Sequence, residues 1–246
     1  MSNQLASYHA AAERFIAQQQ ADEDIIGIIL TGSLVHGSLD KHSDIDIMMI
    51  LRPECDFRER GNTWIDGIEI EYFKNSPQQI RRYFQMERNS PHTAHMLTHG
   101  RVVYQSSPVI DELITEAKSI WNTPPPPLRP PQIEIAKYSF DDRLKDLQDC
   151  YEKQDMMAAS MLRFHMVDFS VNIFCKYHQV FRAKIKGLHA QLAEIDPAFA
   201  KIVSSMTQGK EAWEKNWPRL KRYMEDLLGG ERPKEWVLRS PGEPRS

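Results

Sequence analysis

The stretch LTGSLVHGSLDKHSDIDIMMI, from Leu30 to Ile50, decides the fold of this chain. The apolar run IIGIIL at 25–30 leads into it and is typical of a buried strand. Ten residues separate Gly32-Ser33 from Asp44, where a second strand is expected to begin. Because side chains alternate along a strand, we expect Asp44 and Asp46 to project from the same side of it.

This pair of aspartates predicts a cation site beside an anion site. Two carboxylates held a few ångströms apart repel each other unless a proton or a cation lies between them, and oxygen ligands of this kind suit Mg²⁺. Gly32 lets the backbone approach a ligand closely, and a helix that starts at Ser33 would present N–H groups and a hydroxyl to an anion. Phosphate at this turn and Mg²⁺ at the carboxylates together describe a metal-bound nucleoside triphosphate.

A third carboxylate is expected on a neighbouring strand. The segment IEIEYF at 68–73 alternates acidic and apolar residues, so Glu69 and Glu71 share one face of a strand. Either could complete a two-metal site or remove a proton from an attacking hydroxyl. An ordinary half-exposed strand shows the same alternation, which remains the alternative for these two residues.

These motifs resemble the nucleotidyltransferase superfamily that includes DNA polymerase β and the two-domain aminoglycoside nucleotidyltransferases. An apolar strand, Gly-Ser, about ten residues, Asp-x-Asp and a later strand with an acid occur here in that order. The resemblance implies that Asp44 and Asp46 hold Mg²⁺ against a triphosphate and that a third carboxylate is a metal ligand or base. It assigns this role to Glu69, with Glu71 as the substitute and as a further metal ligand. It also implies that Gly32 and Ser33 bind the triphosphate and that Lys184, in the second domain, can reach it. An ordinary solvated lysine on a helix remains the alternative for Lys184.

Proline marks the boundary between two domains. The segment PPPPLRPP at 124–131 has proline at six of eight positions, which predicts an extended linker. We therefore predict a catalytic domain at 1–123, a helical substrate-binding domain at 132–230 and a tail at 231–246. The expected fold class is α+β with a small mixed sheet, followed by an all-α helical bundle.

Hydrophobic periodicity places the elements. Strands are predicted at 25–30, 44–51, 68–73 and 101–104. Five helices are predicted after the linker, at 133–153, 155–181, 184–195, 197–208 and 211–228. Within the second of these helices, a helically spaced set is expected to face the bundle core: Met157, Met161, Phe164, Phe174, Tyr177 and Phe181.

Composition narrows the class of protein. The 246 residues include 31 Lys and Arg and 34 Asp and Glu, a net charge of −3, which gives no basic field for nucleic acid. No apolar run approaches the roughly 20 residues of a membrane span, and three well-separated cysteines suggest reduced thiols. We expect a cytoplasmic protein, monomeric or homodimeric, with no nucleic-acid or membrane partner.

The expected function is Mg²⁺-dependent transfer of a nucleoside monophosphate, AMP from ATP, to a hydroxyl of a small molecule such as an antibiotic. Residues 132–230 contain 15 basic and 14 acidic side chains, so composition does not favour a polycationic aminoglycoside. Two alternatives stay open. One is an antitoxin-like enzyme that modifies a protein hydroxyl, and the other is a module that senses a nucleoside triphosphate without turnover.

Overall fold

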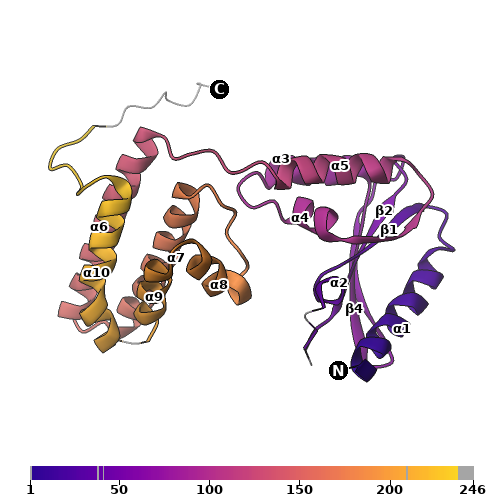
Figure 1. Ribbon diagram of the computed structural model, residues 1–246, viewed down its shortest axis with the longest axis horizontal. Helices are drawn as coiled ribbons and strands as arrows, with labels where there is room; N and C mark the ends of the chain where they lie inside the picture. Colours follow the sequence, from indigo (N-terminus) through magenta and orange to yellow (C-terminus); the bar gives the residue numbers. More distant parts are fainter. Residues whose placement is uncertain (1, 38, 41, 209, 238–246) are drawn as a thin grey trace. The chain divides into compact units, whose positions relative to one another are not determined.

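The computed structural model describes residues 2–37, 39–40, 42–208 and 210–237. The chain forms two compact units, Met1–Thr123 and Pro124–Ser246 (Figure 1). The first unit contains a mixed sheet with helices, and the second is helical, as the sequence predicts. None of the described helices combines the length and the apolar character that crossing a membrane requires.

The sheet of the first unit has five strands in the order β3-β4-β2-β1-β5. β2 and β4 are parallel, whereas the other neighbouring pairs are antiparallel. The bounds are β1 Ile25–Thr31, β2 Ile45–Leu51, β3 Glu59–Ile65, β4 Ile68–Asn75 and β5 Arg101–Gln105.

The edge strand β3 was not predicted from the sequence. Its residues ERGNTWI are mostly polar and include Gly61, so they lack both the apolar run that marked 25–30 and the alternation with isoleucine that marked 44–51 and 68–73. The turn that joins it to β4 has a usable signal, because Asp66 (φ 52°) and Gly67 (φ 76°) both adopt positive φ. Asp-Gly is a favoured pair for such a hairpin turn.

Helices cover both faces of the sheet (Figure 1). α1, Ser2–Gln19, packs on one face against a core that includes Ile28, Ile45 and Ile47. On the other face, α3 Pro77–Met86, α4 His92–His99 and α5 Val109–Trp121 pack against Ile29, Met48 and Ile50. Along β2, successive side chains alternate between the face covered by α3 and the face covered by α1, because side chains alternate along a strand.

Among its described residues, the second unit contains five helices around one core. They are α6 Pro130–Glu152, α7 Met156–Tyr177, α8 Ile185–Ile195, α9 Pro197–Met206 and α10 Lys210–Leu228. α6 begins inside the predicted linker because proline is tolerated in the first turn of a helix, where its missing N–H costs no hydrogen bond.

The predicted core-facing stripe is wrong for most of its members. Phe174 is fully buried and stacks on Phe199, with ring centres 4.1 Å apart. In contrast, Met157, Met161 and Phe164 are 76%, 56% and 51% exposed. α7 instead buries residues of its other faces, both small and large, among them Ala159, Met166 and Ser170, so the large residues at helical spacing indicated the wrong face.

Candidate active site

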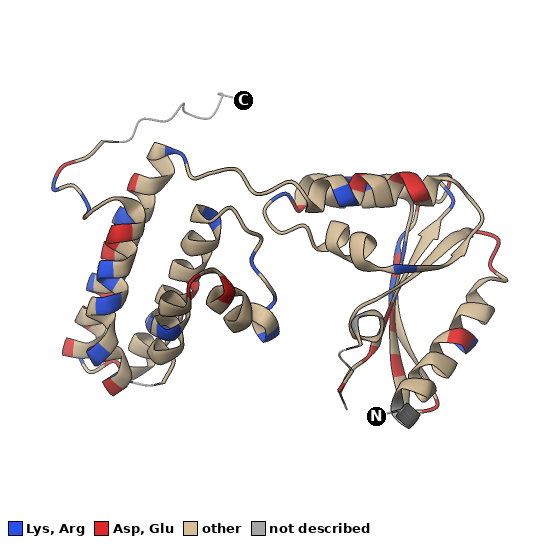
Figure 2. Cartoon of the chain, viewed as in Figure 1, with Lys and Arg blue, Asp and Glu red and all other residues tan. Residues whose placement is uncertain are grey.

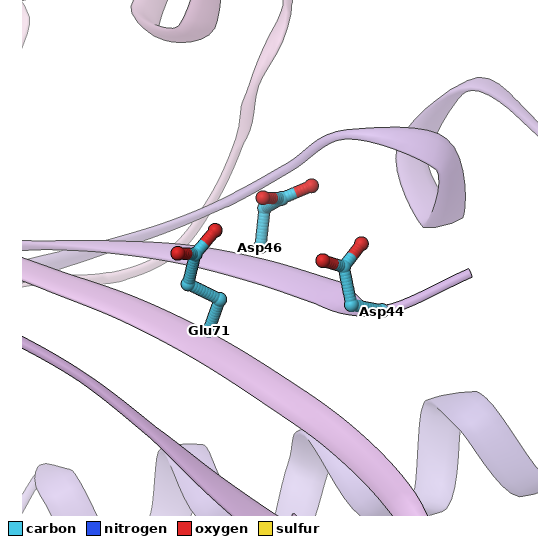
Figure 3. A group of neighbouring side chains, drawn as sticks. All are labelled: Asp44, Asp46 and Glu71. Atoms are coloured by element: carbon cyan, nitrogen blue, oxygen red, sulfur yellow. The ribbon is translucent and has the colours of Figure 1, made fainter. Parts of the chain in front are cut away.

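Three carboxylates meet at one place on the sheet. Asp44 directly precedes β2, Asp46 lies within β2, and Glu71 lies in β4 beside Asp46 in the parallel register. One oxygen of each carboxylate lies within 4.8 Å of the others, and all three residues are half-buried. The side chains point to a common region (Figure 3). Two neighbouring strands therefore position this cluster, which we call the acidic triad.

Glu69 lies on the same face of β4, two residues before Glu71, but outside the triad. Its Oε1 accepts a hydrogen bond from Asn62 Nδ2 at 2.6 Å. The parallel pairing of β2 and β4 determines which of the two glutamates lies near the aspartates, because it places Asp46 opposite Glu71. The geometry thus favours Glu71, the substitute in the sequence analysis, over Glu69 as the third carboxylate.

Arg60 of β3 fixes the position of Glu71. Its Nη2 and Nε donate to Glu71 Oε1 at 2.6 Å and 3.2 Å, and its guanidinium lies 4.9 Å from the centre of the Phe73 ring. The Arg60 side chain is 70% exposed, so its contribution to stability is small, but it limits the rotamers open to Glu71. Sequence reasoning missed Arg60 because it missed the strand that presents it.

Gly32 lies directly against Asp46. Its φ of 72° and ψ of −154° belong to a region that glycine alone adopts without strain. A Cβ atom at this position would lie 2.0 Å from Oδ2 of Asp46. Glycine therefore lets the backbone after β1 reach the carboxylate that the triad contributes from β2.

Ser33 begins the single-turn helix α2, Ser33–His36, which ends at Gly37. Its Oγ is buried and has no hydrogen-bond partner among the described residues. A buried hydroxyl without a partner is costly, so this atom suits a ligand or an ordered water molecule. The Ser33 hydroxyl, which the sequence predicts to bind a phosphate, is therefore available to bind one.

Lys184 lies in the second unit, where it is the exposed N-cap of α8. The predicted contact between Lys184 and a triphosphate remains a prediction.

The acidic triad fits a divalent cation. Three carboxylates that lie this close repel one another, and a cation among them removes that repulsion. Oxygen donors are the ligands that Mg²⁺ uses in proteins. Within the described part of the chain, no other group of three or more His, Cys, Asp or Glu side chains converges in this way.

Comparison with known proteins also indicates that the first unit is a nucleotidyltransferase domain. Residues 13–109 match the family described as Polymerase beta, Nucleotidyltransferase, and this range includes the whole triad together with Gly32 and Ser33. A search of curated protein sequences found no match.

A solved structure shares the fold. It is the crystal structure of a nucleotidyltransferase-like protein from Exiguobacterium sibiricum 255-15, which is 13% identical with a TM-score of 0.50. The alignment covers 89% of this chain and 74% of the other, so both units take part in the similarity. The N-terminal unit of this chain is therefore a nucleotidyltransferase domain of the polymerase β type, and the protein is a transferase.

Proposed function

We propose that this protein is an Mg²⁺-dependent enzyme that transfers AMP from ATP to a hydroxyl group of a small molecule such as an antibiotic. The observation that supports this most is the acidic triad beside Gly32 and the unpartnered Ser33 hydroxyl. Together these groups provide adjacent sites for a cation and for phosphate oxygens, which the substrate MgATP requires.

Asp44, Asp46 and Glu71 would hold the cation. When bound, Mg²⁺ neutralises charge on the phosphate oxygens and helps to align the reacting groups. The triad itself supplies fixed carboxylates on two strands, so their separation does not have to change during the reaction.

The remaining steps use the residues around the triad. Gly32 and Ser33 bind the triphosphate through the backbone and Oγ. The acceptor oxygen attacks the α-phosphorus, a new P–O bond forms, and the bond to the bridging oxygen of the β-phosphate breaks to release pyrophosphate. Glu71, held by Arg60, accepts the proton of the attacking hydroxyl.

The charge of the second unit favours a small acceptor that is not strongly cationic. Basic and acidic residues are interspersed along its helices (Figure 2). Residues 132–230 have a net charge of +1, from 15 basic and 14 acidic side chains. A polycationic acceptor would be better matched by an acidic excess.

The test measures pyrophosphate release and the label transferred from each α-labelled nucleoside triphosphate, with Mg²⁺ and a panel of hydroxylated antibiotics. We expect transfer from ATP by the wild type. Asp44→Asn and Asp46→Asn should each lower the rate by about 100-fold or more, because each removes a charge that stabilises the transition state. Asp56→Asn changes an exposed aspartate outside the triad and is the matched control.

Three outcomes would contradict the proposal. Normal turnover by folded Asp46→Asn would show that the triad is not catalytic. Label on a protein hydroxyl instead of on a small molecule would identify an antitoxin-like enzyme. Tight ATP binding without pyrophosphate release, with every acceptor in the panel, would identify a sensor.

A further inference from the structure

A cavity of about 500 Å³ lies on the same face of the sheet as the acidic triad. We call it the ring pocket. Its volume falls in the range of small-molecule sites, about 300–1,000 Å³. Residues of β2, β3, β4, α3 and α4 line it, among them Met48, Phe73, Asn75, Tyr83 and Met96.

The ring pocket begins where the triad ends. Met48 follows Asp46 by two residues in β2, and Phe73 follows Glu71 by two residues in β4, so each pair shares a face. Two residues along a strand span about 7 Å. Arg60 joins the two sites, because it lines the pocket while donating to Glu71. A molecule in the pocket would therefore extend toward Glu71, the proposed proton acceptor.

Polar groups at the floor of the pocket would select a hydrogen-bonding ligand. Asn75 is only 6% exposed, and its Oδ1 accepts from the Tyr83 hydroxyl at 3.5 Å. That hydroxyl accepts from Arg58 Nη1 at 2.9 Å. The Asn75 side chain lines the pocket, and its Nδ2 can donate a hydrogen bond to an oxygen of a ligand.

The charges around the pocket balance. Arg58, Arg60 and Glu87 contribute charged side chains to its lining, and Glu71 lies beside it and pairs with Arg60. The Glu59 carboxylate lies 3.8 Å from Lys74 Nζ on the other face of the sheet. Glu87 accepts hydrogen bonds from the backbone N–H and the hydroxyl of Thr93. The lining therefore has no acidic excess for a polycation and no basic excess for a polyanion.

We infer that the ring pocket binds the acceptor through an uncharged, hydroxylated ring, and that it directs a hydroxyl of this acceptor toward Glu71. The apolar side chains of Met48, Phe73 and Met96 contact the faces of the ring, and Asn75 binds one of its oxygens. This inference rests on the proposed function, because it assigns the acceptor to the side of the triad away from Gly32.

The first test measures binding by isothermal titration calorimetry, without any need for turnover. The neutral probes are chloramphenicol and 4-nitrophenyl β-D-glucoside, and the polycationic probe is kanamycin. We expect at least one neutral probe to bind the wild type more tightly than kanamycin does. Failure of both neutral probes to bind, or preferential binding of kanamycin, would overturn the inference.

Two variants locate the bound probe. Met96→Trp fills the pocket from α4 and should weaken binding of the neutral probe at least 10-fold. Tyr83→Phe removes the hydroxyl that donates to Asn75 Oδ1, so Asn75 loses a contact that orients it, and binding of the probe should weaken about 3-fold to 10-fold. Met86→Trp places the same large side chain at a 74% exposed position of α3 outside the pocket, and should bind the probe as the wild type does. Circular dichroism checks the fold of each variant.

Titration of MgATP separates this inference from the proposed function. Met96→Trp should change the affinity for MgATP less than twofold, whereas Asp44→Asn should abolish binding of MgATP and leave that of the neutral probe intact. Loss of MgATP affinity in Met96→Trp would place the nucleobase in the pocket and overturn the inference alone. Normal MgATP affinity in Asp44→Asn, with the probe still bound in the pocket, would count against the proposed function instead.

Discussion

Substituting Gly32 by alanine tests whether the backbone after β1 positions the acidic triad. The new Cβ would lie 2.0 Å from Asp46 Oδ2, whereas ordinary contacts begin near 3.4 Å. The carboxylate or the turn must therefore move by roughly 1.4 Å, the difference between these two distances. A displacement of about 1 Å in an active site can cost about 100-fold in rate.

The backbone adds a cost in stability. Alanine at φ 72° and ψ −154° is strained by about 1–3 kcal/mol. We expect Gly32→Ala to lower the free energy of unfolding in urea by about that amount and to lower pyrophosphate release about 100-fold. Both quantities are measured on the same protein, with the acceptor that the antibiotic panel identifies, and MgATP affinity is measured in parallel.

Gly37→Ala is the matched control. Gly37 also has a positive φ, 68°, but a Cβ there would meet nothing within 4 Å. This variant should lose about 1–2 kcal/mol of stability, the cost of left-handed backbone for an L-residue, while MgATP affinity and turnover stay near those of the wild type. If Gly32→Ala turned over ATP as fast as Gly37→Ala, the argument that Gly32 positions Asp46 would be refuted.

Three further predictions follow from the contacts described above. Glu71→Gln should lower pyrophosphate release at least 10-fold more than Glu69→Gln does, because Glu71 belongs to the triad; equal losses would refute this choice of third carboxylate. The Tyr223 hydroxyl donates to Asp196 at 2.7 Å and holds the pKa of that carboxyl below its usual value. At a pH above about 3.9, the pKa of Asp196 in the unfolded chain, the contact therefore stabilises the second unit. This contribution is lost as the pH falls through the lower pKa that Asp196 has in the folded protein. Tyr223→Phe should lower the free energy of unfolding at pH 7 by about 1.5–3 kcal/mol and flatten its decline in acid; an unchanged acid limb in urea titrations would contradict this. Phe174→Ala should cost about 3–5 kcal/mol in the same measurement, because Phe174 is fully buried, and a loss below 1 kcal/mol would show that the core of the second unit is not packed around it.

The sequence was sufficient to find the two strands that flank the Gly-Ser turn and the aspartates. The apolar run before Gly32 and the alternation after Asp44 are local patterns, and strand geometry alone places Asp44 and Asp46 on the same side. The helices of the second unit also follow from local signals, such as Asp196-Pro197, where Asp196 caps α9 through the N–H groups of Ala198 and Phe199. Each of these inferences depends on residues a few positions apart.

The face of α7 that packs inward could not be inferred in this way. Large apolar residues at helical spacing predicted a core stripe, yet Met157 and Met161 are exposed while Ala159 and Ser170 are buried. The neighbouring helices decide which face is covered, and small residues allow them to approach closely. Periodicity in the sequence identifies a helix and an apolar stripe along it, but it does not identify the neighbouring element that covers that stripe.

The sequence by itself determined that two aspartates follow a Gly-Ser turn and share one side of a strand, and that two acids share one face of a later strand, because chain direction and strand period fix these relations. Only the tertiary structure decided that Glu71 is the acid that joins the two aspartates, since the parallel register of β2 and β4 places it beside Asp46. The same holds for Arg60 and for the ring pocket, which depend on an edge strand and on helices that pack across the sheet. Contacts between strands and helices distant in sequence leave no local pattern, so folding alone brings these groups together.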